Sequence, residues 1–267
     1  MRLDDRLEAL YPGASRRRLK RWLEASRVRV NGVVVRRGDA PVGADDRVEL
    51  GASPAPPFPA PLRLVHEDAD LLVVDKPAGL LTIATERERE RTAYRMLMSY
   101  VAGRIFIVHR LDRETSGLIV FAKSYDAKRK LQAQWKARAP ERVYRAVVEG
   151  VVKDPEGTLT GRLTEDRALR GRPARGRAGR EAVTRYRVLE RSRATTLLEL
   201  ALVTGRRGQL RAQLAAAGHP IVGDTAYGSR RDPLRRVCLH ATRLAFVHPR
   251  GGRLSFESPM PRAFARV

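Results

Sequence analysis

A proline-rich stretch between residues 51 and 61 limits how this chain can fold. It reads GASPAPPFPAP and holds five prolines. Because proline lacks a backbone N–H and has a fixed φ, such a run sustains neither helix nor sheet and favours an extended spacer. We therefore expect a small N-terminal domain over residues 1–50, a linker over 51–61 and a larger domain over 62–267.

The small domain is predicted to be α+β. Ser15 is a candidate N-cap. On the helix expected to follow it, three apolar side chains share one face: Leu19, Trp22 and Leu23. The dipeptide Asn31-Gly32 then separates two valine-rich runs, and both residues accept the positive φ of a two-residue hairpin turn.

The remaining positions of that helix carry a run of basic side chains: Arg16, Arg17, Arg18, Lys20 and Arg21. A basic helix beside a tight hairpin can grip a phosphate backbone, and a solvated helix face is the equal alternative. The segment RLDDRLEALYPGASRRRLKRWLEASRVRVNGVVVRRGD, closed by DDRVEL, resembles the small RNA-binding domain shared by a small-subunit ribosomal protein and many RNA-modifying enzymes. The resemblance implies that these residues bind RNA.

The larger domain mixes strand and helix patterns. Continuous apolar runs at 71–74 and 118–122 predict strands buried on both faces, and 196–203 is also strand-like. Helices are expected over 92–103, over 126–138 and from about 207 to 218. Because strands and helices do not alternate strictly, we predict an α+β fold around a mixed sheet.

Two further segments are predicted to lie outside regular elements. Lys76-Pro77-Ala78-Gly79 has the composition of a turn. Residues 167–180, RALRGRPARGRAGR, hold six arginines and no acid, which predicts a mobile loop that RNA orders, or else a solvated insertion.

The charge balance favours nucleic acid as a partner. Lys and Arg number 53 against 30 acids, a net charge of +23, and only seven of the 53 are lysine. Arginine's planar fork suits phosphates, and a preference for arginine codons does not explain the excess over acids. A membrane surface fits less well, because no strongly basic amphipathic helix ends in bulky apolar residues.

Several classes of protein are excluded. No apolar run approaches the roughly 20 residues of a membrane span, and the start lacks a secretory signal. The single cysteine, Cys238, makes neither an internal disulfide nor a thiolate zinc cage, and the five histidines lack metal-ligand spacing. We expect a soluble cytoplasmic protein, monomeric and without a metal.

The densest polar segment before a predicted buried strand runs from His109 to Gly117, HRLDRETSG. Between Arg110 and Arg113, Asp112 is expected to stay ionised, because neighbouring cations favour the charged form. Such a carboxylate suits a nucleophile or general base acting on an anionic polymer. From the residues alone, a loop salt bridge is the favoured alternative.

The segment HRLDRETSGLIVFAKS resembles the signature of RluA-type pseudouridine synthases. Further similar segments occur in the family's order: VHEDADLLVVDKPAGLLT, ERVYRAVVEG, TGRRGQLRAQLAAAGHPIVGDTAYG and LHATRLAFVHP. The likeness covers about residues 62–265. It implies a largely antiparallel central sheet with flanking helices, and an enzyme that converts uridine to pseudouridine in RNA.

The resemblance also implies roles for individual residues. Asp112 is the catalytic aspartate, attacking C1′ or assisting deprotonation, and Arg211 pairs with it. Tyr144 stacks on the flipped base and helps to remove the C5 proton. Arg110 fills the gap left by the uridine or holds a phosphate. The remaining pocket residues are Arg206 and Leu210, with His109 beside them.

The implied reaction needs no cofactor, since the bond from C1′ to N1 is replaced by one to C5 without net electron transfer. In agreement, neither G-x-x-x-x-G-K-[ST] nor a strand-linked G-x-G-x-x-G is present. Extruding the base costs a few kcal/mol, and stacking on Tyr144 offers about 1–3 kcal/mol. Ribosomal RNA is the expected substrate and tRNA the second, because the small domain and linker lengthen the footprint.

Simpler interpretations remain for these residues. Tyr144 fits ordinary strand packing, Arg211 a solvated helix position, and His109 either a proton donor or, more often, a structural loop histidine. The family usually has histidine where Gly208 and Gln213 stand, and lysine at Arg142, which affects support of the pocket. A non-catalytic RNA-binding or ribosome-assembly factor is the rival function, while a zinc deaminase is disfavoured by the single cysteine.

Overall fold

The computed structural model describes residues 1–52, 57–86, 88–101, 103–166, 171–174 and 178–267. By its contacts the chain divides into two compact units, Met1–Pro57 and Phe58–Val267. Each unit is described by itself. The predicted linker lies partly outside the described residues, at 53–56.

The N-terminal unit packs two helices on a three-stranded antiparallel sheet of order β2-β1-β3. Its elements are α1 (Leu3–Leu10), α2 (Arg16–Glu24), β1 (Val28–Val30), β2 (Val33–Val34) and β3 (Val48–Leu50). Asn31 and Gly32 have φ of 51° and 82°, so the predicted two-residue turn is confirmed. Ser15 precedes α2 with an extended backbone, but its side chain accepts no capping hydrogen bond from the described residues.

The predicted apolar face of α2 is also confirmed, since Leu19, Trp22 and Leu23 are buried. They form one core with Leu3 and Leu7 of α1.

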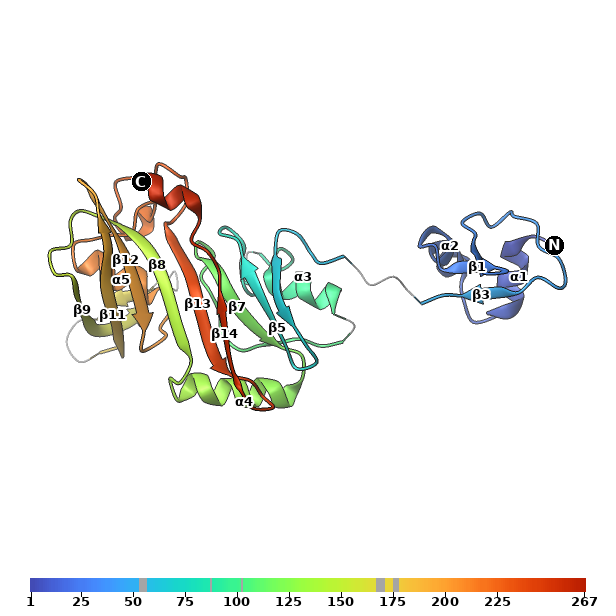
Figure 1. Cartoon of the computed structure of the whole chain (residues 1–267), viewed down its shortest axis with the longest axis horizontal. Helices are drawn as coiled ribbons and strands as arrows, with labels where there is room; N and C mark the ends of the chain where they lie inside the picture. The colour runs from blue at the N-terminus through green and yellow to red at the C-terminus, as the bar shows by residue number, and fades with distance from the viewer. Residues whose placement is uncertain (53–56, 87, 102, 167–170, 175–177) are drawn as a thin grey trace. The chain divides into compact units, whose positions relative to one another are not determined.

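The larger unit is built on one 11-stranded sheet, with strand order β10-β9-β11-β12-β8-β13-β7-β5-β4, β14 beside β13 and β6 beside β7 (Figure 1). Its strands are β4 (Arg63–Glu67), β5 (Leu71–Lys76), β6 (Phe106–Ile107), β7 (Ser116–Ala122), β8 (Glu141–Glu149), β9 (Glu156–Glu165), β10 (Gly171–Pro173), β11 (Arg180–Arg191), β12 (Thr195–Leu202), β13 (Leu239–Val247) and β14 (Arg253–Glu257). Among the described strands only β13 and β7 pair in parallel. The predicted mixed, largely antiparallel sheet is therefore confirmed.

Helices cover both faces of this sheet. They are α3 (Ala93–Tyr100), α4 (Tyr125–Lys136) and α5 (Gln209–Ala216), with 3-10 turns η1 (Thr225–Tyr227) and η2 (Arg262–Arg266). Residues alternate along β5: Leu72 and Val74 join the core beneath α3 and α5, whereas Leu71 and Val73 join the core beneath α4. Period-two alternation in a continuous apolar run thus yields a strand buried on both sides.

Two local predictions are wrong. Lys76 is the last residue of β5, fully buried, and not part of the turn that follows. Within 167–180, Gly171–Pro173 forms β10 against β9 and Arg180 begins β11, while residues 167–170 and 175–177 lie outside the described residues. Backbone pairing to β9 needs no apolar side chains, so composition alone misses β10.

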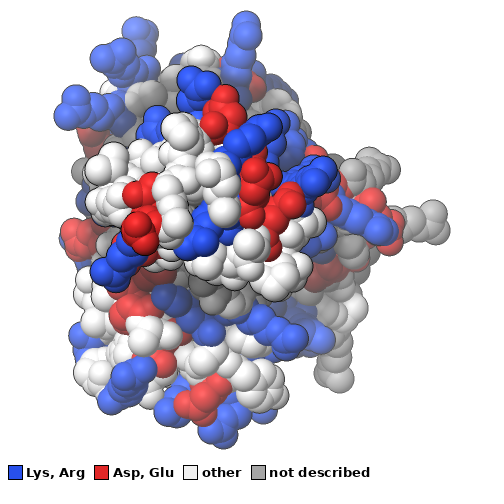
Figure 2. Space-filling model, turned by 90° about the vertical axis from the view of Figure 1, so that its right-hand side faces the viewer, with Lys and Arg blue, Asp and Glu red and all other residues white. Residues whose placement is uncertain are grey.

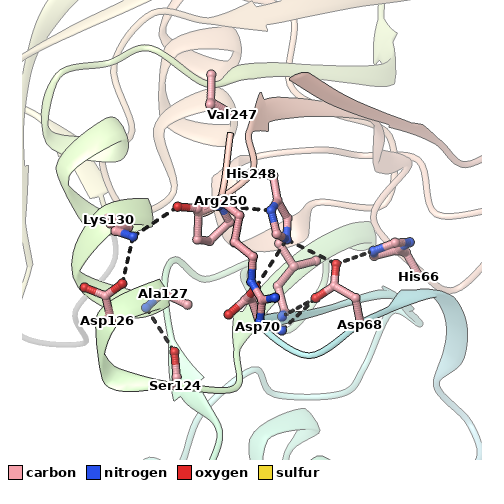
Figure 3. A network of polar contacts seen from close by, with 12 residues as sticks. His66, Asp68, Asp70, Ser124, Asp126, Ala127, Lys130, Val247, His248 and Arg250 are labelled. Carbon is pink, nitrogen blue, oxygen red and sulfur yellow. Dashed lines mark hydrogen bonds and ion pairs between the residues drawn. The ribbon is translucent and has the colours of Figure 1, made fainter. Parts of the chain in front are cut away.

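A polar network lies at the start of β5, the end of the strand away from Lys76 (Figure 3). It joins α4 to the turn between β4 and β5 and to the turn between β13 and β14. His66 and His248 both direct Nε2 toward Asp68 Oδ2, at 2.8 and 3.2 Å, and Arg250 pairs with Asp70. Lys130 of α4 donates to the Pro249 carbonyl at 3.2 Å. Lys130 thus links α4 to the turn between β13 and β14.

No helix in the described part of the chain has the length and apolar character required to cross a membrane. Lys and Arg side chains are spread over the face in Figure 2 with Asp and Glu among them.

Candidate active site

The loop from Val108 to Thr115, between β6 and β7, borders a cavity of about 540 Å³. All seven residues that the sequence placed at the site line this cavity: His109, Arg110, Asp112, Tyr144, Arg206, Leu210 and Arg211. They come from this loop, from β8, from α5 and from the segment before α5. The fold therefore brings together residues that are up to about a hundred positions apart in the chain.

The backbone on both sides of Asp112 is held by the turn that follows β5. Thr82 Oγ1 donates to the Leu111 carbonyl at 2.8 Å and accepts from the Leu111 N–H at 3.2 Å. The Gly79 N–H donates to the Arg113 carbonyl at 2.7 Å, and Arg113 Nε donates to the Gly79 carbonyl at 3.1 Å. Asp112 thus stands between two anchored residues.

The buried ammonium of Lys76 strengthens this anchoring. Its Nζ donates to the carbonyls of Pro77 and Leu80 at 2.9 and 2.7 Å, and lies 3.5 Å from that of Arg113. Burial lowers the pKa of Lys76 to about 7, although the charge of Asp112 opposes the shift. Its hydrogen-bond partners are backbone carbonyls, and the charges of Glu114 and Asp75 also favour its protonated form.

Asp112 is less readily ionised than the sequence predicted. Its side chain is 21% exposed, and burial raises its pKa above the ordinary value, against the opposing charges of Arg211 and Arg110. Arg113, expected to flank the carboxylate, instead directs Nε to the Gly79 carbonyl. The neighbouring cations favour the charged form of Asp112, as the sequence predicts, but desolvation outweighs them and shifts its pKa in the opposite direction.

Arg211 is buried, with 7% of its surface exposed, so the solvated-helix interpretation is wrong. Its guanidinium holds Asp224 with two hydrogen bonds, from Nε at 2.6 Å and from Nη2 at 2.7 Å. Nη1 donates to Glu114 at 2.8 Å, whereas Asp112 Oδ2 lies 4.0 Å from Nη1. The expected pairing with Asp112 is thus a long contact, and two other carboxylates hold the guanidinium.

Tyr144 lies on β8 with 7% of its surface exposed, and it lines the cavity. Burial raises its pKa to about 12, so the hydroxyl is protonated at neutral pH. The ring is part of the core and also faces the cavity, so strand packing and a role at the site are compatible.

Comparison with known proteins settles the family to which this arrangement belongs. A family model described as RNA pseudouridylate synthase matches residues 70–216, a range that includes Asp112, Tyr144 and Arg211. The chain belongs to the RNA pseudouridylate synthase family. It is an RNA pseudouridine synthase, an isomerase, and an S4 domain matches residues 1–48.

Relatives align along nearly the whole synthase. The ribosomal large subunit pseudouridine synthase D of Pseudomonas aeruginosa is 38% identical, over 98% of this chain and 89% of its own. The protein of the same name from Haemophilus ducreyi is 33% identical, over 100% and 89%. The solved structure of human RNA pseudouridylate synthase domain containing 1 shares the fold, with TM-score 0.65, 24% identity and coverage of 74% and 83%.

Of the other predicted pocket residues in the synthase, Arg110 is exposed and Leu210 is buried on α5. Arg206 is half-buried, and its Nε donates to the Glu181 carbonyl at 3.0 Å. His109 stacks on Trp135, with ring centroids 4.8 Å apart, and its Nε2 accepts from the Val120 N–H at 3.3 Å. Burial lowers the pKa of His109 to about 3, which keeps it neutral at neutral pH and favours the structural interpretation over a proton donor.

Sequence reasoning missed the two carboxylates that hold Arg211. Glu114 lies in the quoted HRLDRETSG segment and Asp224 in GDTAYG, yet neither had been given a role. Tyr227, from the same GDTAYG segment, stacks its ring under the Arg211 guanidinium at 4.8 Å. The signal was present as polar residues in matched segments, but the contacts depend on the fold.

The departures from the family pattern have local structural explanations. Gly208 has φ of 59°, and a Cβ there would lie 2.5 Å from the Tyr227 hydroxyl. Gln213 is buried and fully engaged: its Nε2 donates to the carbonyls of Leu159 and Ala182, each at 3.0 Å, and its Oε1 accepts from Thr184 at 2.7 Å.

Arg142, the third departure, borders the cavity beside Tyr144. Its Nη2 lies 3.4 Å from the carbonyls of Leu202 and Thr204, and its buried Nε has no partner among the described residues. The position therefore retains a cation at the cavity wall.

Among the described residues, one group has the spacing of metal ligands: atoms of Asp68, Asp70 and His248 lie within 4.8 Å of one another. The sequence did not reveal this group, because His248 lies far along the chain from the two aspartates. Asp68 Oδ1 already accepts from the N–H groups of Asp70 and Leu71, and Arg250 neutralises Asp70. Protein groups thus already engage both aspartates of this cluster.

The five basic residues predicted to bind RNA are all exposed on α2. Arg16 pairs with Glu8 at 2.8 Å, and the Arg18 guanidinium lies over the Trp22 ring at 5.4 Å.

Proposed function

We propose that this synthase isomerises specific uridines of large-subunit ribosomal RNA, with Asp112 as its catalytic carboxylate. The observation that carries the proposal is a single cavity that holds a partly exposed aspartate, a buried tyrosine and several arginines. Transfer RNA is the second candidate substrate.

The reaction breaks the bond between ribose C1′ and uracil N1 and joins C1′ to C5. The C5 proton is lost, and N1 takes up a proton, so atoms and electrons balance without an oxidant. In this proposal Asp112 attacks C1′ or assists deprotonation. Its backbone anchors keep the carboxylate in place while the uracil turns.

The other cavity residues receive the uridine. Tyr144 offers a ring for stacking, typically worth about 1–3 kcal/mol per base. Arg110, exposed at the cavity, fills the space left in the RNA or holds a phosphate. Arg206 and Leu210 complete the wall, and Arg211 supports the charge of Asp112 from 4.0 Å.

Ribosomal RNA is favoured by two independent features. Relatives that align along nearly the whole chain are ribosomal large subunit pseudouridine synthases. The S4 domain and its basic α2 add a second RNA contact surface to the excess of 23 positive charges, which suits a large structured RNA. We also propose that the enzyme acts as a monomer and in the cytoplasm.

The experiment is conversion of uridine-labelled ribosomal RNA and tRNA, followed by digestion to nucleosides. We expect pseudouridine in ribosomal RNA with the natural protein. Asp112→Asn should abolish turnover and keep RNA affinity within about threefold, because the cavity and its arginines remain. Asp126→Asn, on the exposed surface of α4, is the matched control and should react normally. Turnover by Asp112→Asn, or product only in tRNA, would overturn the proposal.

A further inference from the structure

Arg211 faces three carboxylates with one guanidinium. Asp224, of which 1% is exposed, accepts from Nε and Nη2, and Nη1 is the nitrogen that contacts the other two. Nη1 lies 2.8 Å from Glu114 Oε2 and 4.0 Å from Asp112 Oδ2. Nη1 carries two N–H groups, yet it makes its short hydrogen bond to Glu114, the carboxylate that the reaction does not use, and only a long contact to Asp112.

Glu114 also acts on Asp112 through its charge. The two carboxylates lie two residues apart in one anchored loop and share contact with Arg211 Nη1. Like charges disfavour ionisation, and Glu114 raises the pKa of Asp112, in addition to the effect of burial. Glu114 itself is 42% exposed, so water stabilises its charge.

Several other groups face Asp112, and of these Arg110 and Arg207 favour its ionised form. Those that influence its charge or respond to it are Lys76 of β5, Arg110 of the same loop, Arg207 before α5, Tyr144 of β8 and Tyr227 of η1. Of these, the two tyrosines are neutral phenols whose pKa values are raised, and Lys76 gives its hydrogen bonds to backbone carbonyls. Glu114 is thus the one anionic neighbour, among described residues, that both repels Asp112 and occupies Arg211 Nη1.

We propose that Glu114 is a positioning residue that holds Arg211 Nη1 away from Asp112, and so sets the acid limit of the reaction, while Asp224 fixes the rest of the guanidinium. The inference rests on the proposed catalytic role of Asp112. It assigns Glu114 a function distinct from binding RNA or from stabilising the fold.

The direction of the effect follows from the geometry. Asp112 acts as the carboxylate, so the rate falls when the pH drops through its pKa. Glu114→Gln removes the repulsion but keeps an oxygen that accepts from Nη1. Glu114→Ala also removes that acceptor, which leaves Asp112 as the remaining carboxylate beside Nη1. Both changes favour ionised Asp112 and move the acid limb of the pH–rate profile to lower pH, with Ala moving it at least as far as Gln.

The test measures single-turnover rates against pH with the full-length protein and labelled ribosomal RNA. On the acid limb we expect Glu114→Gln to react about three- to tenfold faster than the natural protein, since one pKa unit is a factor of ten. The rate on the neutral plateau and RNA affinity should change less than about twofold. Glu114→Asp restores the charge and should return the limb toward its natural position.

Glu141→Gln is the matched control, since Glu141 is 38% exposed and pairs with Arg243 and Arg253 outside the cavity. It should leave the acid limb unchanged. An unchanged limb in both Glu114→Gln and Glu114→Ala would overturn the inference, as would an equal loss of rate at every pH, which indicates a purely structural role. Because Asp112→Asn is measured in parallel, turnover by that variant identifies a failure of the proposed function instead.

Discussion

Burial moves the pKa values of active-site side chains in opposite directions. It raises that of Asp112 and brings that of Tyr144 to about 12, and it lowers those of Lys76 and His109 to about 7 and about 3. Desolvation favours the neutral form of each group. The cavity therefore holds a neutral imidazole and a protonated phenol at neutral pH.

Removing the hydroxyl of Tyr144 distinguishes a role in stacking from a role in proton transfer. Tyr144→Phe keeps the ring and should change RNA affinity less than about threefold, but slow conversion by about 10²–10⁴-fold if the hydroxyl assists proton transfer. Single-turnover conversion and filter binding measure the two effects. Tyr186→Phe, on β11, is the control. A Tyr144→Phe variant that reacts at the natural rate would limit Tyr144 to stacking.

We expect the buried side chain of His240 to make the folded protein less stable in acid. It is buried between Ser116 and Ser258, and burial lowers its pKa from 6.5 to about 4. As the pH falls from 6.5 toward 4, the unfolded chain takes up a proton that the folded protein does not. This lowers the free energy of unfolding by roughly 3 kcal/mol at most.

Thermal unfolding across that pH range measures the effect. In His240→Gln the melting temperature should depend less steeply on pH, whatever its absolute value. An unchanged dependence would mean that other groups dominate. His109, with its pKa of about 3, adds a contribution of the same sign that both proteins retain.

At the scale of elements, the sequence predicted those parts whose signals are local. The apolar runs predicted β5 and β7, and the helix expected from 92 is α3, which Thr92 caps by accepting a hydrogen bond from the Arg95 N–H at 3.1 Å. The predicted helix 92–103 was too long, since α3 ends at Tyr100. Where pairing depends on backbone hydrogen bonds to a neighbouring strand, as for β10 on β9, residue composition carried no signal.

Gly208, at the start of α5, lies close to Tyr227, whose ring stacks on Arg211. Gly208→Ala places a side chain at positive φ, which costs about 1–2 kcal/mol, and pushes Tyr227 away from Arg211. We expect a lower melting temperature and slower turnover. Gly161→Ala is the control. Nothing lies within 4 Å of its added Cβ, so neither the melting temperature nor the turnover should fall. Normal turnover by Gly208→Ala would show that Tyr227 adapts freely.

At the scale of the whole molecule, the candidate site is assembled from segments that meet only in the fold. The resemblance supplied Asp112, Tyr144 and Arg211, and all three line one cavity. It did not supply the partners of Arg211, because the approach of Glu114 and Asp224 depends on how β7, α5 and η1 pack. Residue identities were thus predictable, whereas pairings and charge states required coordinates.

The basic residues of α2 lead to a prediction about how salt affects RNA binding by the full chain. Replacing Arg17 and Arg21 of α2 by alanine should reduce the slope of log affinity against log salt by about one to two, if both contact phosphates. Turnover at saturating RNA should be unchanged. Arg37→Ala is the control, because Arg37 pairs with Asp39 at 2.8 Å. An unaltered salt slope would assign α2 to a solvated surface.

The paired anchors beside Asp112, Thr82 on Leu111 and Gly79 on Arg113, have a consequence for the encounter with RNA. The reactive loop is in place before the nucleotide arrives, so little conformational freedom is lost on its side of the complex. The favourable free energy of association is then available to unstack and rotate a base out of its helix. A rigid site in the protein thereby favours a local conformational change in the RNA.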